Sequence, residues 1–154
     1  MSHYGGVLGF CSEYFNSIEM AKKKKTKSQL KKELWKWFSL FIRLRTTDDN
    51  GYSNCATCGA WKHYREVDAG HFITRGELAI LFNPINVQFQ CKRCNMRGGE
   101  QHKMAKYIDG KYGEGTSDGL QILRHGDTSY MDIQWYKEKI EYYTHEVRLL
   151  SSDL

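Results

Sequence analysis

Four of the five cysteines stand in two Cys-x-x-Cys pairs, Cys55 with Cys58 and Cys91 with Cys94. Two residues between thiolates allow both sulfurs of one tight turn to reach the same ion, and two such turns complete a tetrahedral zinc site. The alternatives are two disulfides or a redox-active pair, but disulfides need an oxidising compartment, which nothing in the sequence indicates. We therefore predict structural Zn²⁺ on these cysteines and an ordinary thiol for Cys11.

The 32 residues between Cys58 and Cys91 exceed the gap of the simplest zinc ribbons, so this insertion must carry structure of its own. Its polarity pattern and the segment after it predict two strands and a helix, at residues 66–73, 86–90 and 95–108. His71 falls in the first strand, Asn86 opens the second, and Asn95 opens the helix. This order of strand, His, loop, Asn, strand and helix is typical of a ββα-metal hairpin.

The combination resembles the HNH endonucleases and, more closely, the phage NinG/Rap recombination nucleases. The resemblance covers roughly residues 27–150 and implies a nuclease that cuts branched DNA. It rests on spaced motifs, namely Phe41-Ile42-Arg43-Leu44-Arg45, Cys55-Ala56-Thr57-Cys58-Gly59, Asp68-Ala69-Gly70-His71-Phe72, Arg75, Asn86, Gln90-Cys91-Lys92-Arg93-Cys94-Asn95 and Tyr112-Gly113.

The resemblance implies a role for each residue of the hairpin. A neutral imidazole, with its pKa of ~6.5, can take a proton from water at neutral pH, which makes His71 the general base. A hard ion, Mg²⁺ or Mn²⁺, needs only one or two protein ligands, for which Asp68 and Asn95 are the candidates and His102 the reserve. Asn86 has the structural task of tying the loop so that His71 is oriented.

Two features depart from the common HNH pattern. Many such enzymes carry an acid directly before the base, where this chain has Gly70; Asp68 shares the strand face of that position. The third motif residue is often His and here is Asn95. The structural alternatives are a satisfied core histidine for His71 and a plain turn residue for Asn86.

Positive charge is concentrated in the middle of the chain. Residues 20–108 hold 18 Lys and Arg against seven acids, whereas residues 1–19 have a net charge of −2 and residues 109–154 of −4. This distribution favours a polyanionic partner such as DNA, although a basic protein without such a partner has the same composition. We expect the protein to recognise the backbone and shape of DNA rather than its sequence. The residues expected to contact the DNA phosphates are Arg75, Lys92, Arg93 and Arg97.

Helices are predicted on both sides of the hairpin. Apolar residues recur at three- and four-residue steps from Ser28, a possible N-cap, to about Thr46, and again in a last helix capped by Ser129. That last helix has a heptad-like seam, which either packs on the domain's own core or forms a homodimer. The expected organisation is a flexible basic arm at 1–27, a helix plus zinc-bound nuclease core at 28–128 and a C-terminal amphipathic helix at 129–154.

The length of 154 residues fits a single domain. No apolar run approaches the ~18 residues of a membrane span, and the opening residues make a poor secretory signal, so we expect a cytoplasmic protein, in the host cell if phage-encoded. The expected fold class is α+β, with a zinc-stapled ββα hairpin between two helices. The expected function is a metal-dependent DNA endonuclease; the alternatives are a zinc-knuckle DNA-binding module without catalysis and a degenerate HNH scaffold.

Overall fold

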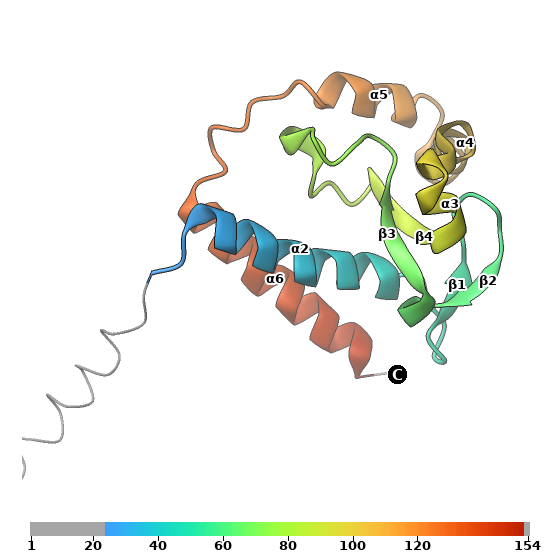
Figure 1. Ribbon diagram of the computed structural model, residues 1–154, viewed down its shortest axis with the longest axis horizontal. Coiled ribbons are helices and arrows are strands. Elements are labelled where there is room, and N and C mark those ends of the chain that lie inside the picture. Colours follow the sequence, from blue (N-terminus) through green and yellow to red (C-terminus); the bar gives the residue numbers. More distant parts are fainter. Residues whose placement is uncertain (1–23, 153–154) are drawn as a thin grey trace, which may run out of the picture.

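The computed structural model describes residues 24–152. The predicted arm up to residue 23, including Cys11, lies outside the described residues. The helices and strands form a mixed α and β fold with two small antiparallel sheets (Figure 1). In chain order they are α2 (Lys27–Leu44), β1 (Tyr52–Asn54), β2 (Trp61–His63), β3 (Val67–His71), β4 (Val87–Cys91), α3 (Lys92–Met96), α4 (Gln101–Tyr112), α5 (Thr116–Leu123) and α6 (Ile133–Ser151).

Helix α2 is the predicted first helix, but its N-cap is Thr26 rather than Ser28. The Thr26 hydroxyl accepts from the Gln29 N–H at 3.3 Å, and the Gln29 side chain accepts from the Thr26 N–H at 2.8 Å. This reciprocal capping box satisfies two backbone donors at once, which a cap at Ser28 would not do. The apolar stripe of α2 is buried, as expected, with Leu34, Phe38 and Ile42 fully inside.

The central hairpin pairs β3 with β4, in the register Asp68 opposite Gln90 and Gly70 opposite Gln88. Alternate residues of a strand point to opposite faces, so these four polar or small residues share one face. The other face carries Ala69 and its apolar neighbours and packs on α2. The hairpin therefore separates α2 from α3 and α4 (Figure 1). A second hairpin, β1 with β2, flanks the first Cys-x-x-Cys pair.

The helix predicted at residues 95–108 is instead two helices, α3 and α4, separated by a turn of 3₁₀ helix. Gly98 and Gly99 at that break have φ of +75° and +80°, values that a right-handed helix cannot contain. Beyond α4, the chain forms a further short helix, α5, which begins at Thr116.

Helix α6 runs beside α2 and starts at the same end of the molecule (Figure 1). Its N-cap is Asp132, which accepts from the Trp135 N–H at 2.8 Å; the prediction of Ser129 is wrong, because that side chain is bonded to Asp127. Tyr136 and Tyr143 of the heptad-like seam are buried against the chain's own core. Homodimerisation through this helix stays a prediction.

The apolar side chains form two larger clusters. One lies between α2, α6 and the apolar face of the β3–β4 hairpin, and the other holds Met104 of α4, Ile108 of α4 and Leu120 of α5 against the loop after β3. Between residues 24 and 152, no helix combines the length and apolar character needed to cross a membrane.

Candidate functional site

The two Cys-x-x-Cys pairs converge. The sulfur atoms of Cys55, Cys58, Cys91 and Cys94 all lie within 4.8 Å of one another, and none of these cysteines forms a disulfide. The first pair lies in the turn between β1 and β2, and the second lies at the junction of β4 with α3. Four converging sulfurs are arranged to hold a metal ion, and the set is compatible with structural zinc.

Backbone donors favour the thiolate form of Cys55, whereas burial raises the pKa of the Cys91 thiol to about 12. Burial opposes ionisation of Cys55, but hydrogen bonds from the Cys91 N–H, from Thr57 and from the Cys58 N–H outweigh it and lower the pKa of the Cys55 thiol to about 6. The Cys91 N–H lies 3.3 Å from the Cys55 sulfur. The cluster thus joins the small β1–β2 hairpin to the end of β4.

On the polar face of the central hairpin, Asp68 of β3 meets Asn95 of α3. The Asn95 Nδ2 donates to Asp68 Oδ2 at 2.9 Å. Within the described part of the chain, no hydrogen bond uses Asp68 Oδ1 or Asn95 Oδ1, so both oxygens are left as acceptors. A carboxylate and an amide oxygen are ligands of the type that a hard divalent cation prefers.

This pair lies in a groove of about 450 Å³ that runs along β3 between α2 and α3, which we call the basic groove. Its lining contains four cationic residues, Arg43, Arg65, Arg75 and Lys92, and Asp68 as the acid. Burial lowers the pKa of Arg43, while the charge of Asp68 acts in the opposite direction. An excess of fixed cations around one carboxylate suits a phosphate diester lying near a bound divalent ion.

His71 is placed beside the basic groove rather than in its lining. Its ring stacks on Trp35, a groove residue, at 5.1 Å between centroids and 23° between planes. The guanidinium of Arg75 lies 4.2 Å from the centroid of the Trp35 ring. His71 also follows Asp68 by three strand residues, so the two side chains leave opposite faces of β3.

The backbone determines which nitrogen of His71 carries the proton. Nε2 lies 3.2 Å from the Leu81 carbonyl oxygen, and a carbonyl can only accept. Neutral His71 is therefore protonated on Nε2, which leaves the lone pair on Nδ1. Burial lowers the pKa of His71, the bond to Leu81 opposes this, and the charge of Arg75 adds a smaller lowering; the resulting pKa is about 4, so the ring is neutral at pH 7.

Asn86 is fully buried and holds the loop that connects β3 to β4. Its Oδ1 accepts from the Ile73 N–H at 2.8 Å, and its Nδ2 donates to the carbonyls of Ile73 and Ile80. These are the contacts of a loop-tying residue. They fix the segment that presents the Leu81 carbonyl to His71.

Gly70 explains the missing acid before the histidine. A Cβ at this position would lie 2.8 Å from the Cβ of Gln90 and closer still to its side-chain oxygen. Gln90 is fully buried and donates to the Gly99 carbonyl at 2.7 Å, so it cannot swing aside cheaply. The carboxylate of the polar face therefore comes from Asp68, two residues earlier.

Three predicted residues lie outside the basic groove. Arg93 is beside the cysteine cluster, where its hydrogen bond to Cys58 raises the pKa of the guanidinium. Arg97 ends α3 and is exposed, and His102, the reserve ligand, is exposed in the first turn of α4. None of the three borders the groove that contains Asp68 and Asn95.

Sequence reasoning missed three residues that line the groove. Trp35 lies next to the buried stripe of α2, Arg43 was assigned to the helix end, and Arg65 comes just before β3. In the sequence, Trp35 stands out as a large aromatic residue beside the regular apolar stripe of α2, and this position could have marked it as a groove residue. Arg43 donates to the Tyr64 carbonyl at 3.1 Å, which no local pattern reveals.

The fold and these sites define a class: a small mixed α and β protein in which four cysteines, arranged so that they could hold a metal ion, lie at one end of a hairpin beside a basic groove. The family model described as Bacteriophage Lambda NinG protein matches residues 16–153, so the chain belongs to the NinG family. This confirms the NinG/Rap resemblance of the motifs. Comparisons with curated proteins and with solved structures returned no match.

Proposed function

We propose that the chain is a metal-dependent endonuclease of the HNH type that hydrolyses phosphodiester bonds of DNA. The observation that carries the proposal is the pairing of Asp68 with Asn95 in the basic groove, next to a neutral histidine of defined tautomer. The preference for branched recombination intermediates rests on the family alone.

His71 is the general base of this proposal. The Leu81 carbonyl holds the proton on Nε2, so Nδ1 is the atom that takes the proton from the attacking water. The His71 ring stacks on Trp35, which lines the groove. In this proposal the scissile phosphate therefore lies at the end of the groove where Trp35 and Arg75 meet. Arg75 is then placed to contact a non-bridging oxygen of that phosphate.

Asp68 and Asn95 would hold a Mg²⁺ or Mn²⁺ ion through their remaining oxygens. Such an ion, when bound, stabilises the charge that develops on the leaving oxygen. The hydrogen bond between the two side chains keeps both oxygens on one side of the hairpin. Arg43, Arg65 and Lys92 bind neighbouring phosphates in the same groove. Structural zinc on the cysteines keeps α3 against β4.

The decisive experiment compares wild type with His71→Ala on plasmid DNA and on linear, flapped and four-way substrates, with Mg²⁺ or Mn²⁺. We expect the variant to bind with unchanged affinity and to lose cleavage by about 10² or more, since it loses the base. The matched control is His125→Ala, an exposed histidine away from the groove.

The alternatives give different results. Salt-dependent DNA binding without cleavage by either protein would identify a zinc-knuckle binding module. Neither cleavage nor salt-dependent binding would identify a scaffold.

A further inference from the structure

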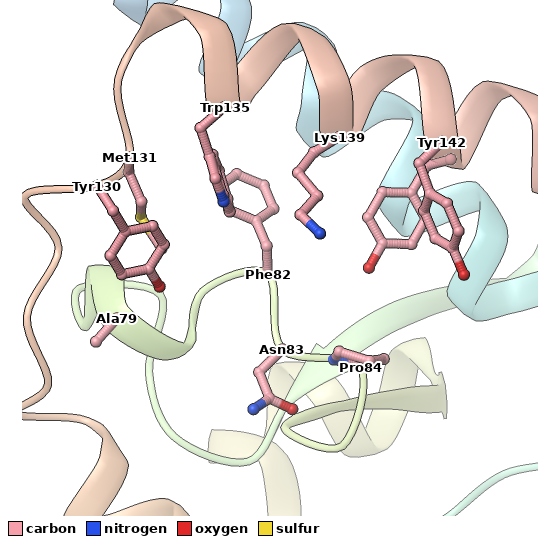
Figure 2. A pocket seen from close by; sticks show the side chains of 10 residues that line it. Ala79, Phe82, Asn83, Pro84, Tyr130, Met131, Trp135, Lys139 and Tyr142 are labelled. Atoms are coloured by element: carbon pink, nitrogen blue, oxygen red, sulfur yellow. The ribbon is translucent and has the colours of Figure 1, made fainter.

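A second hollow lies between α6 and the loop that carries Phe82, Asn83 and Pro84. Figure 2 shows aromatic side chains of α6 and of the segment before it directed toward this loop. The hollow has a volume of about 510 Å³. We call it the aromatic groove, and its principal rings are those of Phe82, Tyr130, Trp135 and Tyr142.

Two of these rings are exposed, yet each is braced. Tyr130 is 53% exposed and meets Trp135 edge-on at 6.0 Å and 73°. Tyr142 is 51% exposed and meets Tyr143 edge-on at 4.9 Å and 78°. An edge-on contact orients a ring without covering both of its faces, so Tyr130 keeps a face on which a flat ligand can stack. Lys139 Nζ lies over the Tyr142 ring, 5.9 Å from its centroid, so a base that stacks on Tyr142 must share the ring with this cation or displace it.

The polar groups of the aromatic groove suit a nucleotide. Lys139 is the charged residue of the lining, and it forms no ion pair with any residue between 24 and 152. The Oδ1 of Asn83 accepts from the N–H groups of Ile85 and Asn86, so the carboxamide is held in place and its Nδ2 remains a donor. Rings for a base and a cation for a phosphate thus line one hollow, whereas the Asn83 amide is directed away from α6 (Figure 2).

A cationic route joins this groove to the basic groove. Trp35 and Arg75 border both the basic groove and a hollow of about 300 Å³. That hollow is also lined by Lys31 and Lys32, contains no acid in its lining, and ends at Phe82, which borders the aromatic groove. Phe82 is itself buried against Phe38 and Trp135, so a polyanionic strand that passes from one groove to the other must cross the loop that carries Phe82.

We propose that the aromatic groove binds an unpaired base of a single strand whose phosphates continue into the basic groove. The proposal rests on the proposed function, in that DNA is the ligand. Stacking on tyrosine requires an exposed base face, which a base inside a duplex does not offer. The groove thereby selects substrates with unpaired bases next to the cleavage site.

The test measures the affinity of the full chain for a fluorescent oligo(dT), without added Mg²⁺ or Mn²⁺ so that no cleavage occurs. Tyr142→Ala and Tyr130→Ala should each weaken binding about tenfold. Tyr142→Phe, which keeps the ring, should stay within twofold. The matched control is Trp61→Ala, which removes a ring that is 55% exposed on β2, outside the aromatic groove, and should change nothing.

Two further ligands separate stacking from charge. A duplex of the same length and an oligonucleotide of abasic sites, which keeps its phosphates, should bind the tyrosine variants and wild type equally. The proposal would be overturned if the tyrosine variants lost as much affinity for the abasic strand as for oligo(dT). It would also be overturned if both variants kept the wild-type affinity for oligo(dT). A shift of oligomeric state in the variants with unchanged oligo(dT) binding would also overturn it and would indicate a second copy of the chain as the occupant.

This outcome is separate from that of the nuclease proposal. Ring-dependent binding by a chain that never cleaves would leave the aromatic groove established and the nuclease rejected. If the chain cleaves DNA but its affinity for oligo(dT) is unchanged in both tyrosine variants, the nuclease proposal stands and the aromatic-groove proposal is rejected. Thermal unfolding and zinc content of each variant, compared with wild type, confirm that the fold is intact.

Discussion

Asn95 donates its amide to Asp68 at 2.9 Å, which joins α3 to the polar face of β3 across 27 residues of sequence. The bond connects two side chains that both line the basic groove. Asn95 directly follows Cys94 in the sequence, so the position of the cysteine cluster also fixes the backbone next to this hydrogen bond. One of the two candidate cation ligands, Asn95, and one of the four candidate zinc ligands, Cys94, are therefore neighbours in one short helix.

The first prediction concerns this pair. Asp68→Asn keeps the size of the side chain but removes the charge that attracts a divalent cation, so cleavage should fall about a hundredfold and the Mn²⁺ concentration required should rise. Cleavage rates measured against Mn²⁺ concentration test this. Asp49→Asn, at an exposed turn, is the control, and equal behaviour of the two variants would contradict the assignment.

The basic groove predicts which cations bind phosphate. Arg75→Ala and Lys92→Ala should each lower the slope of log affinity against log salt by about one, because each removes a phosphate contact. Arg97→Ala, which changes an exposed arginine outside the groove, should leave the slope unchanged. Titrations of a DNA duplex at several salt concentrations measure the slopes, and a uniform effect of all three would argue for a diffuse charge effect.

Substitution of glycine by alanine should change the stability of the fold in opposite directions at Gly70 and at Gly110. Gly70→Ala should destabilise the fold by about 1–3 kcal/mol, because the new Cβ meets Gln90. Gly110→Ala in α4 meets nothing within 4 Å and should stabilise by about 0.5–1 kcal/mol. Denaturant unfolding of both variants decides the matter. Gly70→Asp, which would restore the common HNH acid, should be destabilised as well and not more active.

The burial of His71 predicts a pH dependence of stability. Its folded pKa of about 4 lies below the ordinary value of ~6.5, so the unfolded chain takes up the proton first as the pH falls. The corresponding stability is fully present above about pH 6.5 and is lost between about pH 6.5 and 4, by up to about 1.4 kcal/mol per pH unit. Urea unfolding at pH 7, 6 and 5 should show a shallower loss for His71→Gln, which does not titrate. Parallel pH curves for the two proteins would refute it.

The cysteine cluster predicts a metal-dependent fold. Cys94→Ser should lose bound zinc and lower the melting temperature by roughly 10 °C, because a structural site contributes several kcal/mol to folding. Elemental analysis and thermal unfolding are the measurements. The control is Cys11→Ser, the remaining cysteine, which should retain a full complement of zinc; zinc retained by Cys94→Ser would contradict the ligand set.

Features that depend on near neighbours in the sequence were accessible before the fold was known. Two Cys-x-x-Cys pairs, the apolar stripe of α2 and the two hairpin strands each follow from spacing within a few residues. Helix caps were less accessible, because Thr26 and Ser28, or Ser129 and Asp132, are equally good local candidates. The contacts of each side chain choose between them, as the Ser129 bond to Asp127 shows.

The groove itself depends on long-range packing. Trp35 contacts both His71 and Arg75 because α2 packs on the apolar face of the hairpin, which brings together residues more than 30 positions apart. The tautomer of His71 likewise depends on a loop carbonyl that Asn86 holds in place. Residue types and spacing thus predicted which side chains could bind metal or take up a proton. Burial and contacts between distant segments decided which of these groups share one groove, because side-chain direction and solvent exclusion exist only after the elements have packed.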